Sequence, residues 1–111
     1  MGVVLQQMED YERALDYCQQ ALRGYEKVLG KTHPETLMTV TNIGSMFMDG
    51  LKDFSKGEEM TRLALNGYEK SLGKDYNDTK ACARNLNVFL EEMGRLAEKT
   101  ALEEIYPESG L

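Results

Sequence analysis

The sequence predicts an all-α protein, a solenoid of antiparallel helix pairs. The first observation is an internal repeat: residues 24–31 (GYEKVLGK) recur 43 positions later as residues 67–74 (GYEKSLGK). Self-similarity at such a period is typical of solenoids and other repeat arrays. The second is that apolar residues inside each repeat recur at helical intervals of three and four. The third is that no segment shows the sustained alternation expected of a strand.

Each helix is placed by a local pattern. The clearest apolar stripe runs along residues 11–29, at Tyr11, Ala14, Leu15, Cys18, Ala21, Leu22, Tyr25 and Leu29. Gly30 and Gly73 stand where this helix and its repeat should end. Thr32 and Asp75 each precede an acidic residue by three positions, which is capping-box spacing, so we expect them to be N-caps. A small residue at Gly44 would let two helices approach closely.

These signals give a map of six helices, at about residues 2–8, 11–29, 33–49, 53–72, 76–93 and 96–106. The middle unit has one extra residue, which we place in the turn at residues 49–52. Pro107 should end the last helix early, because the residue before a proline avoids the helical conformation. We expect one domain, residues 1–111, with a truncated first unit and a degenerate last one. The units are about 1–31, 32–74 and 75–111.

Four segments carry a resemblance to a known family: residues 11–14 (YERA), 21–22 (AL), 24–36 (GYEKVLGKTHPET) and 42–44 (NIG). They resemble tetratricopeptide repeats of the long-period type found in kinesin light chains. The resemblance implies that the first helix of each pair lines a concave surface, which binds a peptide or protein segment. It also implies that Asn42 and Asn85 hydrogen-bond a peptide backbone or carboxylate, since an amide offers both donor and acceptor.

The expected peptide-binding residues lie along this surface: Met38, Thr41, Asn42, Ser45, Arg84, Asn85 and Val88. A structural explanation competes for several of them. A repeated asparagine is also suited to bonding a neighbouring helix, and Arg84 to pairing with Glu91 or a surface carboxylate. Met38 is suited to an adaptable binding surface, but for a methionine near the edge of the core we favour the other role, filling a gap between units.

Composition excludes several classes of function. The net charge of −6 argues against nucleic acid and anionic membrane as partners, because both require dense Lys and Arg. No apolar run is long enough to span a bilayer, and the N-terminal segment lacks the features of a signal peptide. We therefore expect a cytoplasmic protein. With one histidine and two cysteines, no metal site is expected, and the thiols should be reduced.

We expect no cofactor and no enzymatic activity. The sequence contains no glycine-rich phosphate-binding loop, and a Cys82–His33 dyad would lack a third orienting group. The leading hypothesis is a protein-interaction scaffold that binds a peptide or protein segment. The alternative is a structural module whose open repeat ends pair as a homodimer, because the stub at residues 2–8 would cover little of the stripe on residues 11–29.

Overall fold

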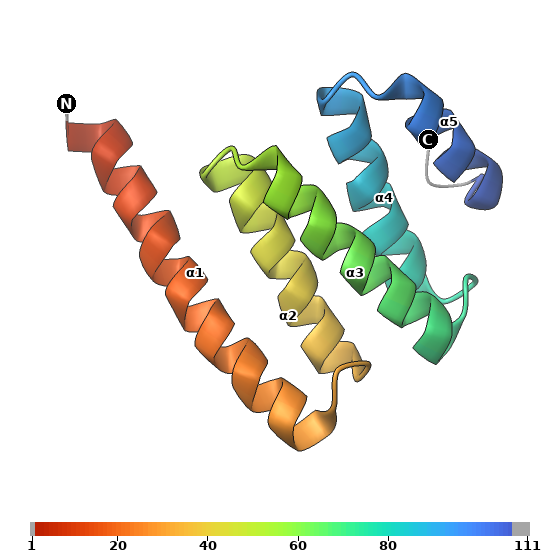
Figure 1. The fold of residues 1–111 in the computed structure, drawn as a ribbon, viewed down its shortest axis with the longest axis horizontal. Helices are drawn as coiled ribbons and strands as arrows, with labels where there is room; N and C mark the ends of the chain where they lie inside the picture. The colour runs from red at the N-terminus through yellow and green to blue at the C-terminus, as the bar shows by residue number, and fades with distance from the viewer. Residues whose placement is uncertain (1, 108–111) are drawn as a thin grey trace.

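The computed structural model describes residues 2–107, with side chains described from residue 10 onward. Its elements in order are α1 (Gly2–Leu29), α2 (Pro34–Ser45), the π-helical turn η1 (Met46–Gly50), α3 (Phe54–Leu72), α4 (Asn77–Glu92) and α5 (Leu96–Ile105). Each helix packs beside the one before it and runs antiparallel to it, in a row that begins at α1 (Figure 1). The all-α prediction is confirmed, and the five α-helices fit the expected helix pairs.

The first helix differs from the prediction. Residues 2–29 form one continuous helix, so the expected turn after residue 8 was wrong. No glycine or proline occurs between residues 3 and 23, so nothing there breaks the helix. The second unit turns at the corresponding place with Gly50 and with Lys52 at a φ of 57°. The residues of the expected stub therefore extend α1 and do not fold back onto it.

The extra residue of the second unit was predicted in the turn at residues 49–52, but the irregular segment begins earlier, where α2 ends. There the helix widens into η1, and the N–H of Leu51 donates to the carbonyl of Met46 at 3.1 Å, five residues back. A π-helical turn holds one more residue between donor and acceptor than an α-helical turn does. The predicted helix at residues 33–49 is thus α2 followed by η1.

The predicted N-caps lie one residue too early. Helix α2 is capped by His33, and not by Thr32: the Nδ1 atom of His33 accepts from the N–H of Glu35 at 3.1 Å. Because a proline follows, His33 takes an extended conformation (φ −67°, ψ 140°), which suits an N-cap. Helix α4 begins after Tyr76, and not after Asp75, without a side-chain cap.

The predicted helix ends are confirmed. Gly30 and Gly73 directly follow α1 and α3 and have φ values of 93° and 87°, which favour glycine. Helix α5 ends at Ile105, two residues before Pro107. The residue between them, Tyr106, has left the helical conformation (φ −125°, ψ 78°).

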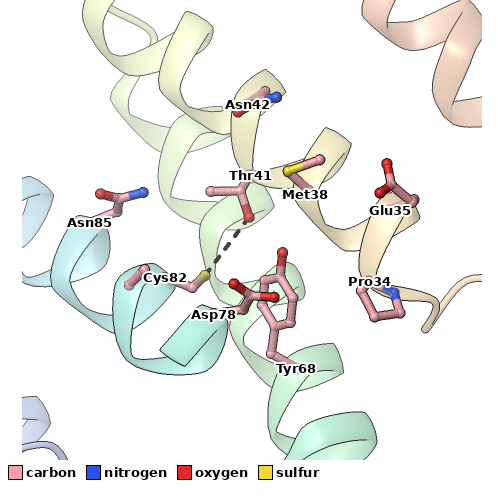
Figure 2. A pocket seen from close by; sticks show the side chains of 10 residues that line it. Pro34, Glu35, Met38, Thr41, Asn42, Tyr68, Asp78, Cys82 and Asn85 are labelled. Carbon is pink, nitrogen blue, oxygen red and sulfur yellow. Dashed lines mark hydrogen bonds between the residues drawn. The ribbon is translucent and has the colours of Figure 1, made fainter. Parts of the chain in front are cut away.

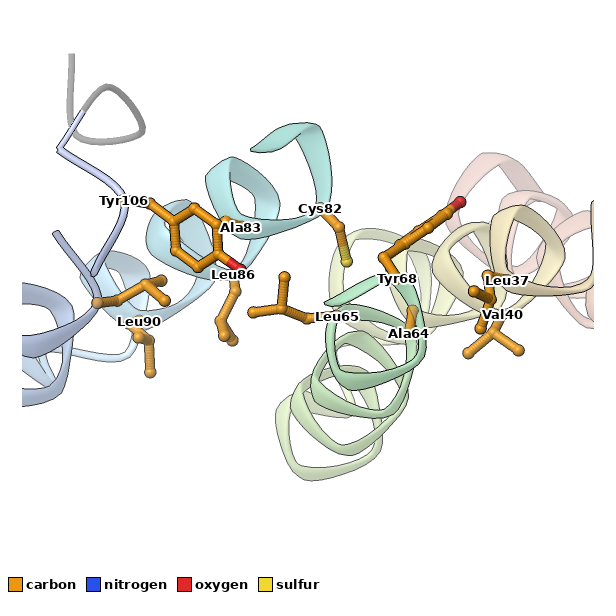
Figure 3. Close-up of a cluster of buried hydrophobic side chains, with 11 residues drawn as sticks. Leu37, Val40, Ala64, Leu65, Tyr68, Cys82, Ala83, Leu86, Leu90 and Tyr106 are labelled. Carbon is orange, nitrogen blue, oxygen red and sulfur yellow. The ribbon is translucent and has the colours of Figure 1, made fainter. Parts of the chain in front are cut away.

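The hydrophobic core lies between α2, α3, α4 and α5 (Figure 3). Its buried members are Leu37, Val40, Ala64, Leu65, Tyr68, Cys82, Ala83, Leu86, Leu90, Leu102 and Tyr106. From α1, the partly buried Leu22 packs against this cluster. Tyr25 belongs to the predicted apolar stripe, but it is 37% exposed, whereas its repeat counterpart Tyr68 is 4% exposed. Helix α1 is therefore at the edge of the core.

Helices α2 and α3 approach closely because each has a glycine opposite a larger side chain of the other. A Cβ atom added at Gly67 would lie 2.5 Å from Cδ2 of Leu37. One added at Gly44 would lie 3.3 Å from Cβ of Met60 and 2.8 Å from Oγ1 of Thr61. The role predicted for Gly44 is confirmed.

Polar contacts attach the last helix to α3. The Tyr106 hydroxyl donates to Glu69, and Arg95 at the start of α5 pairs with Glu58. Glu58 also accepts from Arg62 at 2.7 Å. Burial raises the pKa of Glu58, but the hydrogen bonds from Arg95 and Arg62 outweigh it, so the pKa lies below its ordinary value. The carboxylate is therefore ionised at neutral pH and keeps both arginines in place.

Candidate functional site

A hollow of about 260 Å³ opens between α2, α3 and α4 (Figure 2). We call it the central hollow. Helices α2 and α4 form its two sides, and Tyr68 of α3 lies between them. Its lining residues are Pro34, Glu35, Met38, Thr41, Asn42, Tyr68, Asp78, Ala81, Cys82 and Asn85.

The structure brings together four of the seven predicted binding residues. Those that line the central hollow are Met38, Thr41, Asn42 and Asn85. Ser45 lines a second hollow of about 290 Å³, between α1 and the end of α2, which also includes Asn42. Arg84 and Val88 are exposed and lie outside both hollows.

The competing structural roles for these residues find little support. Within residues 10–107, neither the amide of Asn42 nor that of Asn85 makes a hydrogen bond, and no ion pair involves Arg84. Met38 is 48% exposed and so does not fill a gap between units, whereas Met48 is fully buried. The two amides at the central hollow are thus available to a ligand.

Tyr68 supplies a buried hydroxyl to the central hollow. The side chain projects from α3, with its hydroxyl turned toward α2 (Figure 2). Burial and the negative charge of Asp78 raise the pKa of Tyr68 to about 12, and the neighbouring Thr41 hydroxyl offsets this only in part. The phenol is therefore neutral at physiological pH and can donate or accept a hydrogen bond.

Sequence comparison establishes the family. Residues 1–60, more than half of the chain, match the family model for the tetratricopeptide repeat. The chain belongs to the tetratricopeptide repeat family. A search of curated protein sequences found no match to it. Tetratricopeptide repeats are generally protein–protein interaction modules, and the helix pairs α2–α3 and α4–α5 are arranged as such repeats.

The thiol in the hollow of this tetratricopeptide repeat protein is unsuited to nucleophilic chemistry. Cys82 is buried and donates to the carbonyl of Thr61 at 3.6 Å, with the Thr41 hydroxyl 4.0 Å away. Burial raises the pKa of Cys82 to about 11, so the thiol stays protonated. His33 caps α2 and makes no bond to Cys82. Among the side chains of residues 10–107, no group of three or more potential ligands could hold a metal ion.

The rim of the central hollow is acidic. Glu35 and Asp78 occupy equivalent positions in the first turns of α2 and α4, and both are exposed. Acidic residues are common there because they complement the helix dipole. No Lys or Arg is among the lining residues. In the sequence, both acids signal only a helix start, and their recurrence at the repeat period does not by itself place them beside one hollow.

No helix within residues 2–107 combines the length and apolar character needed to cross a membrane.

Proposed function

We propose that this protein is a non-enzymatic scaffold that binds a peptide segment along the surface formed by α2 and α4. The observation that carries the proposal is the pair of uncommitted amides, Asn42 and Asn85, on either side of the central hollow. A side-chain amide can donate to a peptide carbonyl and accept from a peptide N–H, so it recognises an extended backbone of any sequence. Ser45, Thr41 and Met38 extend the surface on α2, and Arg84 and Val88 extend it on α4.

The charge of the hollow indicates what the peptide carries. Glu35 and Asp78 supply two carboxylates at the rim, and the Tyr68 hydroxyl can accept a hydrogen bond inside. Opposite charges across an interface favour the correct partner and disfavour like-charged ones. We propose that a Lys or Arg side chain of the peptide enters the hollow, with the peptide backbone held by the two asparagines.

The test is a positional-scanning peptide library applied to the purified protein, followed by titration of the best peptide. We expect selection for Lys or Arg at one position. The double substitution Asn42→Ala and Asn85→Ala should weaken the titrated peptide by at least about tenfold without lowering the unfolding midpoint. Asn66→Ala, which removes an exposed asparagine of α3 outside the hollow, serves as the matched control.

The acidic rim is tested separately. Glu35→Gln and Asp78→Asn should each weaken the basic peptide, and added salt should weaken the wild-type complex because exposed charges are screened. Unchanged affinity of the double asparagine variant would contradict the site. Selection of acidic peptides would leave the surface in place but contradict the proposed ligand.

The finer assignments from the sequence remain predictions. The repeat period of about 43 residues supports a kinesin light chain-like subtype and the division into units 1–31, 32–74 and 75–111. The free thiols of Cys18 and Cys82 are compatible with a cytoplasmic location.

A second candidate function is self-association as a homodimer, and the bare face of α1 favours it. In α3, the residues that face α2 are buried, including Ala64 and Tyr68. Their repeat counterparts in α1, Ala21 and Tyr25, are exposed. Light scattering at micromolar concentration tests this candidate. A mass of twice 12.6 kDa supports the homodimer, and a mass of 12.6 kDa contradicts it.

A further inference from the structure

We infer that α1 pairs with α1 of a second copy in antiparallel orientation, with Tyr17 of each copy packed on Gly24 of the other. This inference rests on the self-association proposed above and specifies its geometry. It follows from a packing pattern that the molecule already uses once, between α2 and α3.

In that pattern, each helix has a large residue followed seven positions later by a glycine. Helix α2 has Leu37 and Gly44, and α3 has Met60 and Gly67. The helices are antiparallel, so the two pairs meet reciprocally (Figure 1). Leu37 lies over Gly67, where an added Cβ atom would be 2.5 Å from Cδ2 of Leu37. Gly44 lies against Thr61 and Met60: an added Cβ atom would be 2.8 Å from Oγ1 of Thr61 and 3.3 Å from Cβ of Met60.

Helix α1 has the same pattern without an occupant. Tyr17 and Gly24 are seven residues apart, at the repeat positions of Met60 and Gly67. Tyr17 is 79% exposed, and, apart from its chain neighbours and the adjacent backbone of α1, no described atom lies within 4 Å of a Cβ atom added at Gly24. A glycine inside a helix is less favourable than an alanine, so an empty position of this kind brings no benefit within one copy.

A second copy supplies both missing parts. Seven residues span about 10 Å along a helix, and residues seven apart lie on the same face. When two α1 helices are related by a two-fold axis beside Ala21, Tyr17 of each lies opposite Gly24 of the other. Such an interface is self-complementary, as a two-fold axis requires. The same face also has Ala14 and half-buried Cys18, whose small side chains permit a close approach.

The surroundings of α1 leave this face accessible. Among the described residues, α1 packs mainly on α2 and η1, and it forms one edge of the row of helices (Figure 1). The ring of Tyr11 lies against Gly50 of η1, which fixes how α1 is turned. A second copy can therefore approach from the open side without displacing α2.

The experiment measures the dimer dissociation constant by sedimentation or light scattering over a range of concentrations. Tyr17→Ala removes the large side chain, and Gly24→Leu fills the space above the glycine. Each should weaken the dimer by at least about tenfold, since each change affects both symmetric contacts. Tyr76→Ala, at an exposed tyrosine just before α4 and outside this face, should change nothing. Far-UV circular dichroism verifies that all variants remain helical.

Mixing the two variants gives the sharper test. In a mixed dimer, one contact keeps Tyr17 over Gly24, and the other brings the two substituted positions together, so that the large and the small side chain are exchanged. The mixture should therefore dimerise more tightly than either variant alone. A wild-type dimer that both substitutions leave unchanged would overturn this pairing but not self-association. A wild-type monomer at every concentration would overturn both, and failure of the mixture to recover would exclude the reciprocal contact.

Discussion

Thr36 and Thr79 occupy equivalent positions in the second and third repeats and are both fully buried, but their hydroxyl groups differ. The Thr36 hydroxyl donates to the carbonyl of Gly30 at 2.7 Å. The Thr79 hydroxyl has no hydrogen-bond partner among the described residues. Replacing a hydrogen-bonded hydroxyl by a methyl group loses the bond and leaves its partner unsatisfied, whereas removing an unsatisfied buried hydroxyl relieves a desolvation cost.

We therefore predict opposite outcomes for the same substitution. Thr36→Val should lower the free energy of unfolding by about 1–2 kcal/mol. Thr79→Val should leave it unchanged or raise it. Urea unfolding followed by circular dichroism measures both, and the nearly equal shape of Val and Thr makes each variant the control for the other. Equal losses at the two positions would show that the hydrogen bond contributes nothing.

At the residue scale, the resemblance to tetratricopeptide repeats singled out Asn42 and Asn85, and both lie at the central hollow. Tyr68 was not singled out, because its place in the apolar stripe indicates packing, and it does pack. Its place in the central hollow depends on how α2 and α4 lie around it, which a pattern within one helix does not contain.

At the scale of the helix, close approach sets the requirement for glycine. Gly67 faces Leu37 of α2, whereas its repeat counterpart Gly24 faces open space. Gly67→Ala should lower the free energy of unfolding by about 1–3 kcal/mol, because buried Leu37 has little room to move. Gly24→Ala should raise it by about 0.5–1 kcal/mol in dilute monomer, because alanine favours the helix. Urea unfolding at low protein concentration distinguishes the two.

The opposite signs are essential to this prediction. Equal destabilisation by both changes would mean that α1 has a packing partner within one copy, which would contradict the bare face on which the dimer proposal rests.

The observed helix boundaries agree better with local sequence signals than with boundaries transferred from one repeat to another. The expected turn after residue 8 was inferred by alignment with the second unit, although the segment contains no residue that breaks a helix. Where local signals were strong, as at Gly30, Gly73 and Pro107, the boundaries were correct. The N-cap shift to His33 has the same origin, since a proline fixes the conformation of the residue before it.

In the whole molecule the helices lie in a row, so the stability of each helix depends on the helices that it packs against. Helix α3 packs between α2 and α4, whereas α1 packs mainly on α2 and η1. The fold class was predictable because every repeat has the same periodicity. The acidic rim was not, because it forms only when the starts of α2 and α4 lie beside one hollow.

Hydrogen exchange can compare the C-terminal part of α1 with that of α3. Their sequences hardly differ, since residues 24–31 and 67–74 differ at one position, so a difference in exchange rate reports the surroundings of each helix. In dilute protein, backbone amides in α1 should exchange faster than their counterparts in α3, by on the order of tenfold or more, because fewer contacts oppose local opening. As the concentration rises into the range where copies pair, exchange in α1 should slow while exchange in α3 stays constant. Mass spectrometry of the peptides that cover each segment measures both.

Equal protection of the two segments in dilute protein would show that α1 is as stable as α3 in a single copy. Protection of α1 that ignores concentration would mean that pairing does not use this helix.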